Sequence, residues 1–198
     1  MRTFLDDTLV ADNGTADALG QALDVARERA QAMGRVIVEV WADGIRVGDN
    51  DLTEPPPGPA PYAAELRLIS ETPSALVRSA LLDAADAAAE LRSTQTAAAD
   101  HLLAGRTLEG VDALREALGL WESIRRVIVD GGSMIGRPLE ADPAVSGLLT
   151  ELQARLASVG RLMTAKDWPA LADELGYDLS DHAEGWRVGL NTLADTLA

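Results

Sequence analysis

The chain has 198 residues, a formal net charge of −15, 47% hydrophobic residues and only 4% aromatic residues. The hydrophobic fraction is that of a globular protein, and the shortage of aromatic side chains indicates a core of alanine and leucine between closely packed helices. The acidic balance disfavours binding to nucleic acid and to anionic membranes, and the absence of cysteine excludes disulfides, thiolate nucleophiles and cysteine-ligated metals. Because the first residues contain no apolar signal core and no apolar run approaches ~18 residues, we expect a cytoplasmic protein.

The N-terminal segment predicts a β-hairpin followed by a helix. Residues 3–10 contain two short β-prone pieces around the turn-prone pair Asp6-Asp7. Asn13-Gly14-Thr15 then supplies a helix start, and Gly34 stands where a glycine commonly ends a helix. The apolar residues between these points recur at alternating spacings of four and three, which is typical of one helix face. They are Leu19, Leu23, Ala26, Ala30 and Met33.

Residues 36–47 give the clearest β signal in the chain. Asp43-Gly44 predicts a two-residue type I′ turn, because both central residues of that turn need positive φ. This register places Val40 opposite Val47, and it places Trp41 opposite Arg46, where a modest cation–π contact is expected. It also puts five apolar side chains on one face of the hairpin. They are Val36, Val38, Val40, Ile45 and Val47.

Residues 49–62 are predicted to be a linker-like loop, because the proline-rich run 55–61 is incompatible with a helix or a central strand. Asp49-Asn50-Asp51 begins like a calcium-binding loop but lacks the required glycine and glutamate, so we interpret it as a turn. A further strand is expected over 65–69. The resulting order, ββαβββ, resembles a ubiquitin-like β-grasp domain over about residues 1–70, which implies a mixed sheet packed on one helix.

Residues 71–198 predict an antiparallel bundle of about five helices. Thr72-Pro73 begins the first helix, whose apolar positions keep strict 4–3 spacing as far as Gly105. Those positions are Val77, Leu81, Ala84, Ala88, Leu91, Gln95, Ala98 and Leu102. The sequence leaves open whether the helix over 73–103 is continuous, because the polar run 93–96 could interrupt it.

The remaining helices are bounded by glycine and aspartate. The second ends at Asp130-Gly131-Gly132, and the third opens at Asp142-Pro143. A short fourth helix is capped by Asp167 and ended by Gly176, and a fifth carries Trp186 on its apolar face. The expected fold class is therefore α+β, with a small β-grasp-like N-terminal domain followed by an antiparallel helical bundle.

The sequence contains no recognisable catalytic, cofactor-binding or metal-binding constellation. Its only histidines, His101 and His182, are each alone in their segments, whereas a metal site in a bundle needs paired histidine and carboxylate ligands. We interpret Asp178, Asp181 and His182 as solvated residues that cap a helix start. The glycine-rich segment 131–136 follows a helix and has no lysine, so it is predicted to be a flexible inter-helix loop and not a phosphate-binding loop.

Three apolar side chains are candidates for contact with a partner. Trp168 lies between Asp167 and Pro169 at a helix start, where it either anchors a partner or packs into the core. Met134 and Ile135 are apolar residues within the glycine-rich segment, and they either enter the core or form a contact point.

Two resemblances bear on function. The segment from Asp167 to Leu179, followed by Trp186, resembles a pattern in uncharacterised bacterial proteins that pair a small β-rich domain with helices. In helix pattern and acidity, residues 72–198 are loosely similar to flagellar export chaperones, which are all-helical and wrap an amphipathic segment of a secreted subunit. That similarity implies a protein partner and no enzymatic activity.

We therefore expect a non-enzymatic adaptor or chaperone-like protein that holds an amphipathic helix of a partner in a bundle groove. The alternative is a homodimeric structural or oligomerisation module, in which apolar helix surface that is not buried in the core forms the dimer interface. A third hypothesis is an enzyme that uses carboxylates in a cleft, and several acids with raised pKa values would indicate it.

Overall fold

The computed structural model describes residues 1–12, 18–56 and 61–197, except for the Asp12 side chain. The chain divides into two compact units, Met1–Pro73 and Ser74–Ala198. The first contains a five-stranded sheet and the second consists of helices, so the α+β fold class is confirmed. The predicted helix start at Asn13-Gly14-Thr15 and part of the proline-rich run lie outside the described residues.

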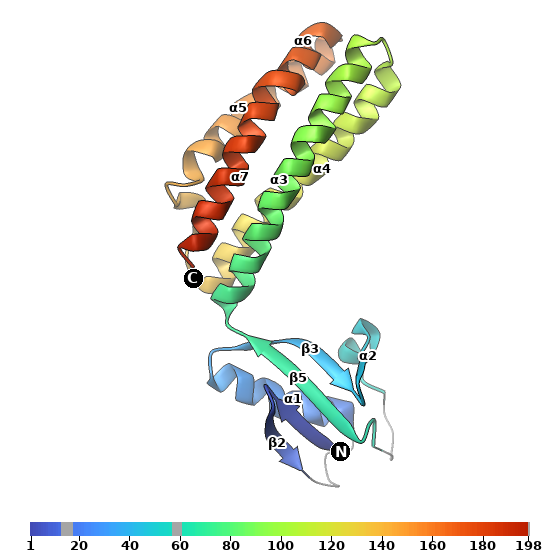
Figure 1. Ribbon diagram of the computed structural model, residues 1–198, viewed down its shortest axis with the longest axis vertical. Helices are drawn as coiled ribbons and strands as arrows, with labels where there is room; N and C mark the ends of the chain where they lie inside the picture. The colour runs from blue at the N-terminus through green and yellow to red at the C-terminus, as the bar shows by residue number, and fades with distance from the viewer. Residues whose placement is uncertain (13–17, 57–60, 198) are drawn as a thin grey trace. The chain divides into compact units, whose positions relative to one another are not determined.

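The N-terminal unit, called the β unit below, has the β-grasp arrangement that the element order predicts (Figure 1). The sheet order is β2-β1-β5-β3-β4, in which the central β1–β5 pair is parallel and the other pairs are antiparallel. Its elements are β1 (Arg2–Leu5), β2 (Thr8–Asp12), α1 (Leu19–Ala32), β3 (Val36–Ala42), β4 (Ile45–Arg46), α2 (Asp49–Thr53) and β5 (Glu65–Glu71).

Tight turns with positive φ join the strands of both hairpins. Asp6 and Asp7 have φ of 47° and 63°, and Asp43 and Gly44 have φ of 48° and 83°, as a type I′ turn requires. The predicted hairpins and the predicted pairing of Trp41 with Arg46 are confirmed. The Asp43 carboxylate also accepts hydrogen bonds from the backbone N–H groups of Ala64 and Glu65, at 3.1 and 2.8 Å, which ties this turn to the start of β5.

The core of the β unit lies between the sheet and α1. Leu19, Leu23, Ala26 and Ala30 are buried, as the helical spacing predicts. The prediction that Met33 belongs to this buried face is wrong. Met33 is 48% exposed, because α1 ends at Ala32 and the chain turns away through Gly34.

A β-bulge changes which residues of β3 face the core. The pairing with β5 shifts register between Ile37 and Glu39. Ile37 and Val40 therefore pack in the core, while Val36 is exposed. Ile45, on the edge strand β4, is also exposed, so the prediction of one continuous apolar face from Val36 to Val47 is wrong. The loop prediction is also wrong over Asp49–Thr53, which forms the short helix α2 ahead of the prolines.

The C-terminal unit, called the helical unit below, is an antiparallel helical bundle (Figure 1). Its elements are α3 (Pro73–Leu103), α4 (Thr107–Ile135), the 3₁₀ turn η1 (Leu139–Ala141), α5 (Ser146–Ala165), α6 (Trp168–Asp173), the π-helical turn η2 (Glu174–Asp178) and α7 (Leu179–Asp195). Helix α3 is continuous through residues 93–96, and all eight of its predicted apolar-stripe positions, Gln95 included, are buried.

Helix α4 is longer than predicted. It continues through Gly131 and Gly132 to Ile135, and Gly136 in the left-handed conformation follows its last turn. The glycine-rich segment is therefore the end of a helix and not a flexible loop. A Cβ atom on Gly132 would lie 2.8 Å from the carbonyl oxygen of Arg137, so glycine at this position lets the chain fold back closely against the helix.

The predicted fourth and fifth helices form one helix. Helix α6 passes through η2 into α7 without a break, so Gly176 lies inside a helix and does not end one. A Cβ atom on Gly176 would lie 3.3 Å from the Cβ atom of Ala99, which shows that the turn packs closely on α3. Asp167 caps the start of this helix as predicted, since its carboxylate accepts a hydrogen bond from the Ala170 N–H at 3.2 Å.

Candidate functional site

An apolar groove runs along the seam between α3 and α4, and we call it the α3–α4 groove. It consists of two adjoining hollows of about 520 and 240 Å³ that share Ala80, Ser123 and Val127. Its lining comprises Leu76, Val77, Ala80, Asp83, Ala84 and Ala87 from α3, and Ser123, Ile124, Arg126, Val127, Asp130, Gly131 and Met134 from α4.

The groove follows from the residue pattern of its two walls. Core residues on α3 recur at 77, 81, 84 and 88, and a groove residue of α3 precedes each of them by one position, at 76, 80, 83 and 87. On α4 the same relation joins the core residues 124, 128 and 131 to the groove residues 123, 127 and 130. Small side chains such as Ala80, Ala87 and Ser123 leave the seam hollow, because they are too short to fill it.

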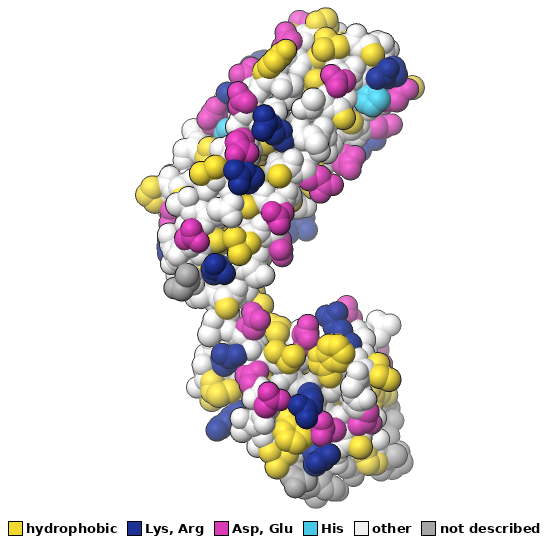
Figure 2. Space-filling view, viewed as in Figure 1, with side chains coloured by type: hydrophobic (Ala, Val, Ile, Leu, Met, Phe, Trp, Pro, Cys, Tyr) yellow, Lys and Arg dark blue, Asp and Glu magenta, His cyan; other side chains and the backbone are white. Residues whose placement is uncertain are grey.

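The α3–α4 groove has an apolar floor and a charged rim. Asp83 and Asp130 contribute carboxylates, and Arg126 contributes a guanidinium group. Arg126 lies 4.0 Å from the Glu122 carboxylate on the same helix. The visible surface of the helical unit shows the same mixture of acidic, basic and apolar side chains (Figure 2).

The structure separates the three residues predicted to contact a partner. Met134 is 54% exposed and lines the α3–α4 groove. Its neighbour Ile135 and the more distant Trp168 are half-buried and pack against the bundle core. The other groove residues, such as Leu76, Ala80 and Val127, were not predicted, although their 4–3 spacing beside the core stripe is visible in the sequence.

A buried polar network lies in the centre of the helical unit. The Trp186 indole N–H donates a hydrogen bond to Nε2 of His182 at 2.9 Å. The amide of Gln95, in the orientation that satisfies both neighbours, accepts from the Trp121 indole at 3.0 Å and donates to the Leu179 carbonyl at 3.1 Å. Trp121 also packs edge-on against Trp186, with 5.7 Å between the ring centroids.

The prediction that His182 is a solvated cap residue is therefore wrong. His182 is only 5% exposed, because η2 joins α6 to α7 and places this residue in mid-helix, facing the core. Its Nε2 must be unprotonated to accept from an indole N–H, which can only donate. Burial lowers the pKa of His182, which agrees with a neutral imidazole.

His182 and Glu151 form a carboxylate–imidazole pair, but both ring nitrogens of His182 already have partners. Nδ1 of His182 lies 3.5 Å from the Glu151 carboxylate. The second ring nitrogen is occupied by Trp186, so this imidazole has no free nitrogen to act as a base. Arg155 in turn bridges Glu151, Glu174 and Asp178 at 2.8, 3.4 and 3.1 Å, which ties α5 to η2.

Three carboxyl groups on the helices have pKa values shifted downward. Glu122, Glu151 and Glu184 each accept a hydrogen bond from an arginine on the same helix, which lowers the pKa of each carboxyl group. A general acid needs the opposite shift. Among residues 1–12, 18–56 and 61–197, no group of three or more histidine, aspartate or glutamate side chains converges in a geometry that could hold a metal ion.

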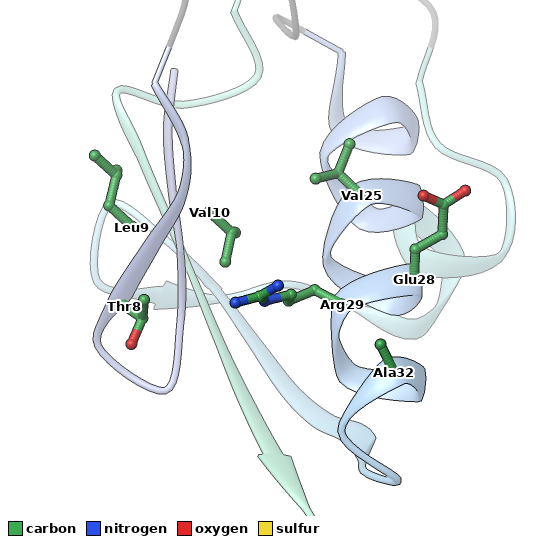
Figure 3. Close-up of a pocket in the computed structure, with 7 residues that line it drawn as sticks. All are labelled: Thr8, Leu9, Val10, Val25, Glu28, Arg29 and Ala32. Carbon is green, nitrogen blue, oxygen red and sulfur yellow. The ribbon is translucent and has the colours of Figure 1, made fainter.

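The β unit has a hollow of its own, of about 430 Å³, between β2 and α1 (Figure 3). It is lined by Thr8, Leu9, Val10, Val25, Glu28, Arg29 and Ala32. Figure 3 shows the Arg29 side chain extending from α1 toward β2 and Val10 directed into the gap, whereas Glu28 points away from β2. The hollow is therefore lined by apolar side chains and by two charged ones, of which only Arg29 is directed toward β2.

The opposite face of the sheet carries a different contact from the one predicted. The Trp41 indole N–H donates to the Glu39 carboxylate at 2.9 Å, and Arg67, not Arg46, makes the cation–π contact in the described part of the chain. The Arg67 guanidinium lies 5.4 Å from the centre of the Phe4 ring. Arg67 is also paired with Glu65 and Asp7, so its charge is satisfied within the sheet.

No family model matches this chain, and comparison with curated proteins and with solved structures likewise gave no match. Within its described residues, the chain has no helix that is both long enough and apolar enough to span a membrane. Support for a function must therefore come from the geometry of the chain itself.

Proposed function

We propose that this protein is a non-enzymatic protein–protein interaction module, adaptor or chaperone-like, that holds an amphipathic helix of a partner in the α3–α4 groove. The observation that carries the proposal is the groove itself, an apolar seam with a charged rim on the helical unit. Loose similarity of the helix pattern to flagellar export chaperones agrees with it but adds no diagnostic residue.

The walls of the groove favour a helical occupant. Both walls are α-helices, whose backbone N–H and C=O groups are already paired within each helix. An occupant therefore finds no main-chain partners and must satisfy its own backbone hydrogen bonds, which a helix does. From Leu76 to Ala87 the groove extends ~16 Å, about three helical turns, at 1.5 Å per residue.

The net negative charge of α3 and α4 favours a basic partner. Helices α3 and α4 together carry nine aspartate or glutamate residues and five arginine residues. A partner helix with lysine or arginine beside its apolar stripe complements Asp83 and Asp130 at the rim. A second copy of this chain instead brings a further net charge of −15 to the interface, which opposes the homodimer alternative.

Two designed peptides and two matched variants test the proposal. The peptides are 18-residue amphipathic helices with the same leucine and alanine face and with either lysine or glutamate on the polar face. We expect the lysine peptide to bind the full chain in a fluorescence anisotropy titration and the glutamate peptide to bind at least about tenfold more weakly, because like charges repel at the rim.

Ala80→Arg should weaken binding of the lysine peptide by about tenfold or more, because it fills the groove and adds a repelling charge. Ala89→Arg is the matched control, since Ala89 is an exposed alanine of α3 outside the groove. Equal affinity of both variants for the peptide would rule out the groove as the site. A molar mass that doubles with concentration, without peptide binding, would support the homodimer instead.

A further inference from the structure

The β unit exposes a strand edge beside the hollow of Figure 3. In the order β2-β1-β5-β3-β4, strand β2 pairs only with β1, so one side of its backbone has no neighbour in the sheet. An edge strand presents a row of N–H and C=O groups that can pair with another extended chain. This surface differs in kind from the α3–α4 groove, whose walls offer no free backbone groups.

Arg29 gives the same surface a charge preference. In the described part of the chain, Arg29 has no carboxylate or hydrogen-bond partner, whereas Arg27 pairs with Asp24 and Arg35 with Asp6. Its side chain is exposed and extends toward β2 (Figure 3). Two charged side chains line the hollow: Arg29 extends toward β2, whereas Glu28 points away from it, so Arg29 is the charge that faces a strand added at this edge.

We propose that the edge of β2 and its hollow bind an extended segment of a partner protein by strand addition, with an aspartate or glutamate of that segment paired to Arg29. The alternating side chains of an added strand point to opposite faces of the sheet. One set therefore turns toward Val10, Val25 and Arg29, where an apolar residue fills the hollow and a neighbouring acidic residue on that face meets the guanidinium group.

This surface is a second recognition site, independent of the helix-binding groove in the proposed function. It would let one chain hold a helix on the helical unit and a strand on the β unit. The two sites have opposite charge preferences, since the groove favours a basic helix and the β2 edge favours an acidic strand.

A display selection with random 12-residue peptides, presented without a free C-terminus, tests the proposal on the full chain. We expect enriched peptides to have β-branched residues at every second position and to contain an aspartate or glutamate. Arg29→Glu should weaken their binding at least about tenfold, and replacing the peptide's acidic residue by lysine should restore binding to this variant. Arg27→Glu, an exposed change on the same helix outside the hollow, should leave the affinity unchanged.

Main-chain pairing has its own test. Two peptides are compared, one N-methylated at its odd-numbered residues and the other at its even-numbered residues. One of the two should lose binding, because its methyl groups replace the N–H groups that pair with β2. The proposal is overturned if no peptide is enriched, if Arg29→Glu binds as well as the wild type, or if neither N-methylated peptide loses binding. Ala80→Arg should not alter binding of these peptides, which distinguishes failure of this site from failure of the α3–α4 groove.

Discussion

The two units of this protein place their buried polar side chains differently. In the β unit, the buried polar side chains among the described residues are Thr3 and Ser70, which share the core-facing side of their strands with Leu5 and Leu68. The Asp6 carboxylate accepts from the Ser70 N–H at 2.8 Å, whereas the Thr3 hydroxyl has no hydrogen-bond partner in the described part of the chain. In the helical unit, Gln95, His182 and the two indole N–H groups of Trp121 and Trp186 are linked inside the core.

The difference reflects how each unit fixes its alignment. Turns with positive φ and strand pairing set the register of the β unit, so the register does not depend on hydrogen bonds between side chains in the core. An apolar helix stripe made mainly of alanine and leucine tolerates sliding and rotation, whereas a buried hydrogen bond is satisfied in only one alignment. We infer that the Gln95 amide, which accepts from Trp121 of α4 and donates to the Leu179 carbonyl of α7, fixes the alignment of α3, α4 and α7.

Removing the central indole should have the largest effect. Trp186→Ala deletes a fully buried side chain and leaves Nε2 of His182 without its donor, so the helical unit should lose about 3–5 kcal/mol of unfolding free energy. Urea unfolding followed by circular dichroism at 222 nm measures the loss. Trp168→Ala, at a half-buried tryptophan, should cost clearly less, and an equal loss would contradict a special role for the network.

Two glycines of α4 should respond to alanine substitution with smaller changes in unfolding free energy, of opposite sign. Gly132→Ala places a Cβ atom 2.8 Å from the Arg137 carbonyl oxygen and should destabilise the helical unit by about 1–3 kcal/mol. Gly119→Ala, in the same helix with no atom near its added Cβ, should stabilise it by up to about 1 kcal/mol. Stabilisation by both changes would mean that α4 does not pack against residues 137–139.

Acid should distinguish the two units, since the only histidines lie in the helical one. Burial lowers the pKa of His182 in the folded state, so below the ordinary value of about 6.5 the unfolded chain binds a proton that the folded chain does not. The stability of the helical unit should be constant above pH ~6.5 and should fall as the pH decreases toward the folded-state pKa, by at most about 1.4 kcal/mol per pH unit.

Urea midpoints between pH 7.5 and 5.5 measure this dependence. His182→Gln, which keeps a neutral acceptor for Trp186, should remove it, and His101→Gln, at the other histidine, is the matched control. A pH dependence that survives His182→Gln would assign the effect to other groups.

The sequence predicts those parts of the fold that depend on local chemistry. The Asp43-Gly44 turn, the apolar face of α1 and the long stripe of α3 are visible as residue types at fixed spacing. The bulge in β3 is not visible, because it depends on how Ile37 and Glu39 meet β5. The continuation of α4 through Gly131 and Gly132 is hidden for a similar reason: packing outweighs the low helix propensity of glycine.

The candidate sites are only partly predictable. Met134 is identified from the sequence, and the rest of the α3–α4 groove requires knowledge that α3 and α4 lie side by side. The edge position of β2 follows from the β-grasp order, whereas the absence of a partner for Arg29 among the described residues depends on which carboxylates surround it in space. Local sequence patterns thus predict the helices and strands, whereas the candidate sites depend on contacts between these elements.

The π-helical turn η2 has a consequence for how this region can tolerate insertion and deletion. Each residue of an α-helix advances the next side chain by about 100° around the axis. Leu171, Leu175, Leu179 and Ala183 are spaced by four residues throughout, a pattern that drifts around a regular α-helix, yet all four are buried because η2 takes up the drift. Deleting one residue there would leave a regular α-helix with its two ends still in phase, because a π-helical turn holds one residue more than an α-helical turn. Inserting one residue into the regular part of α7 ahead of Trp186 would instead rotate Trp186 by about 100° away from Trp121.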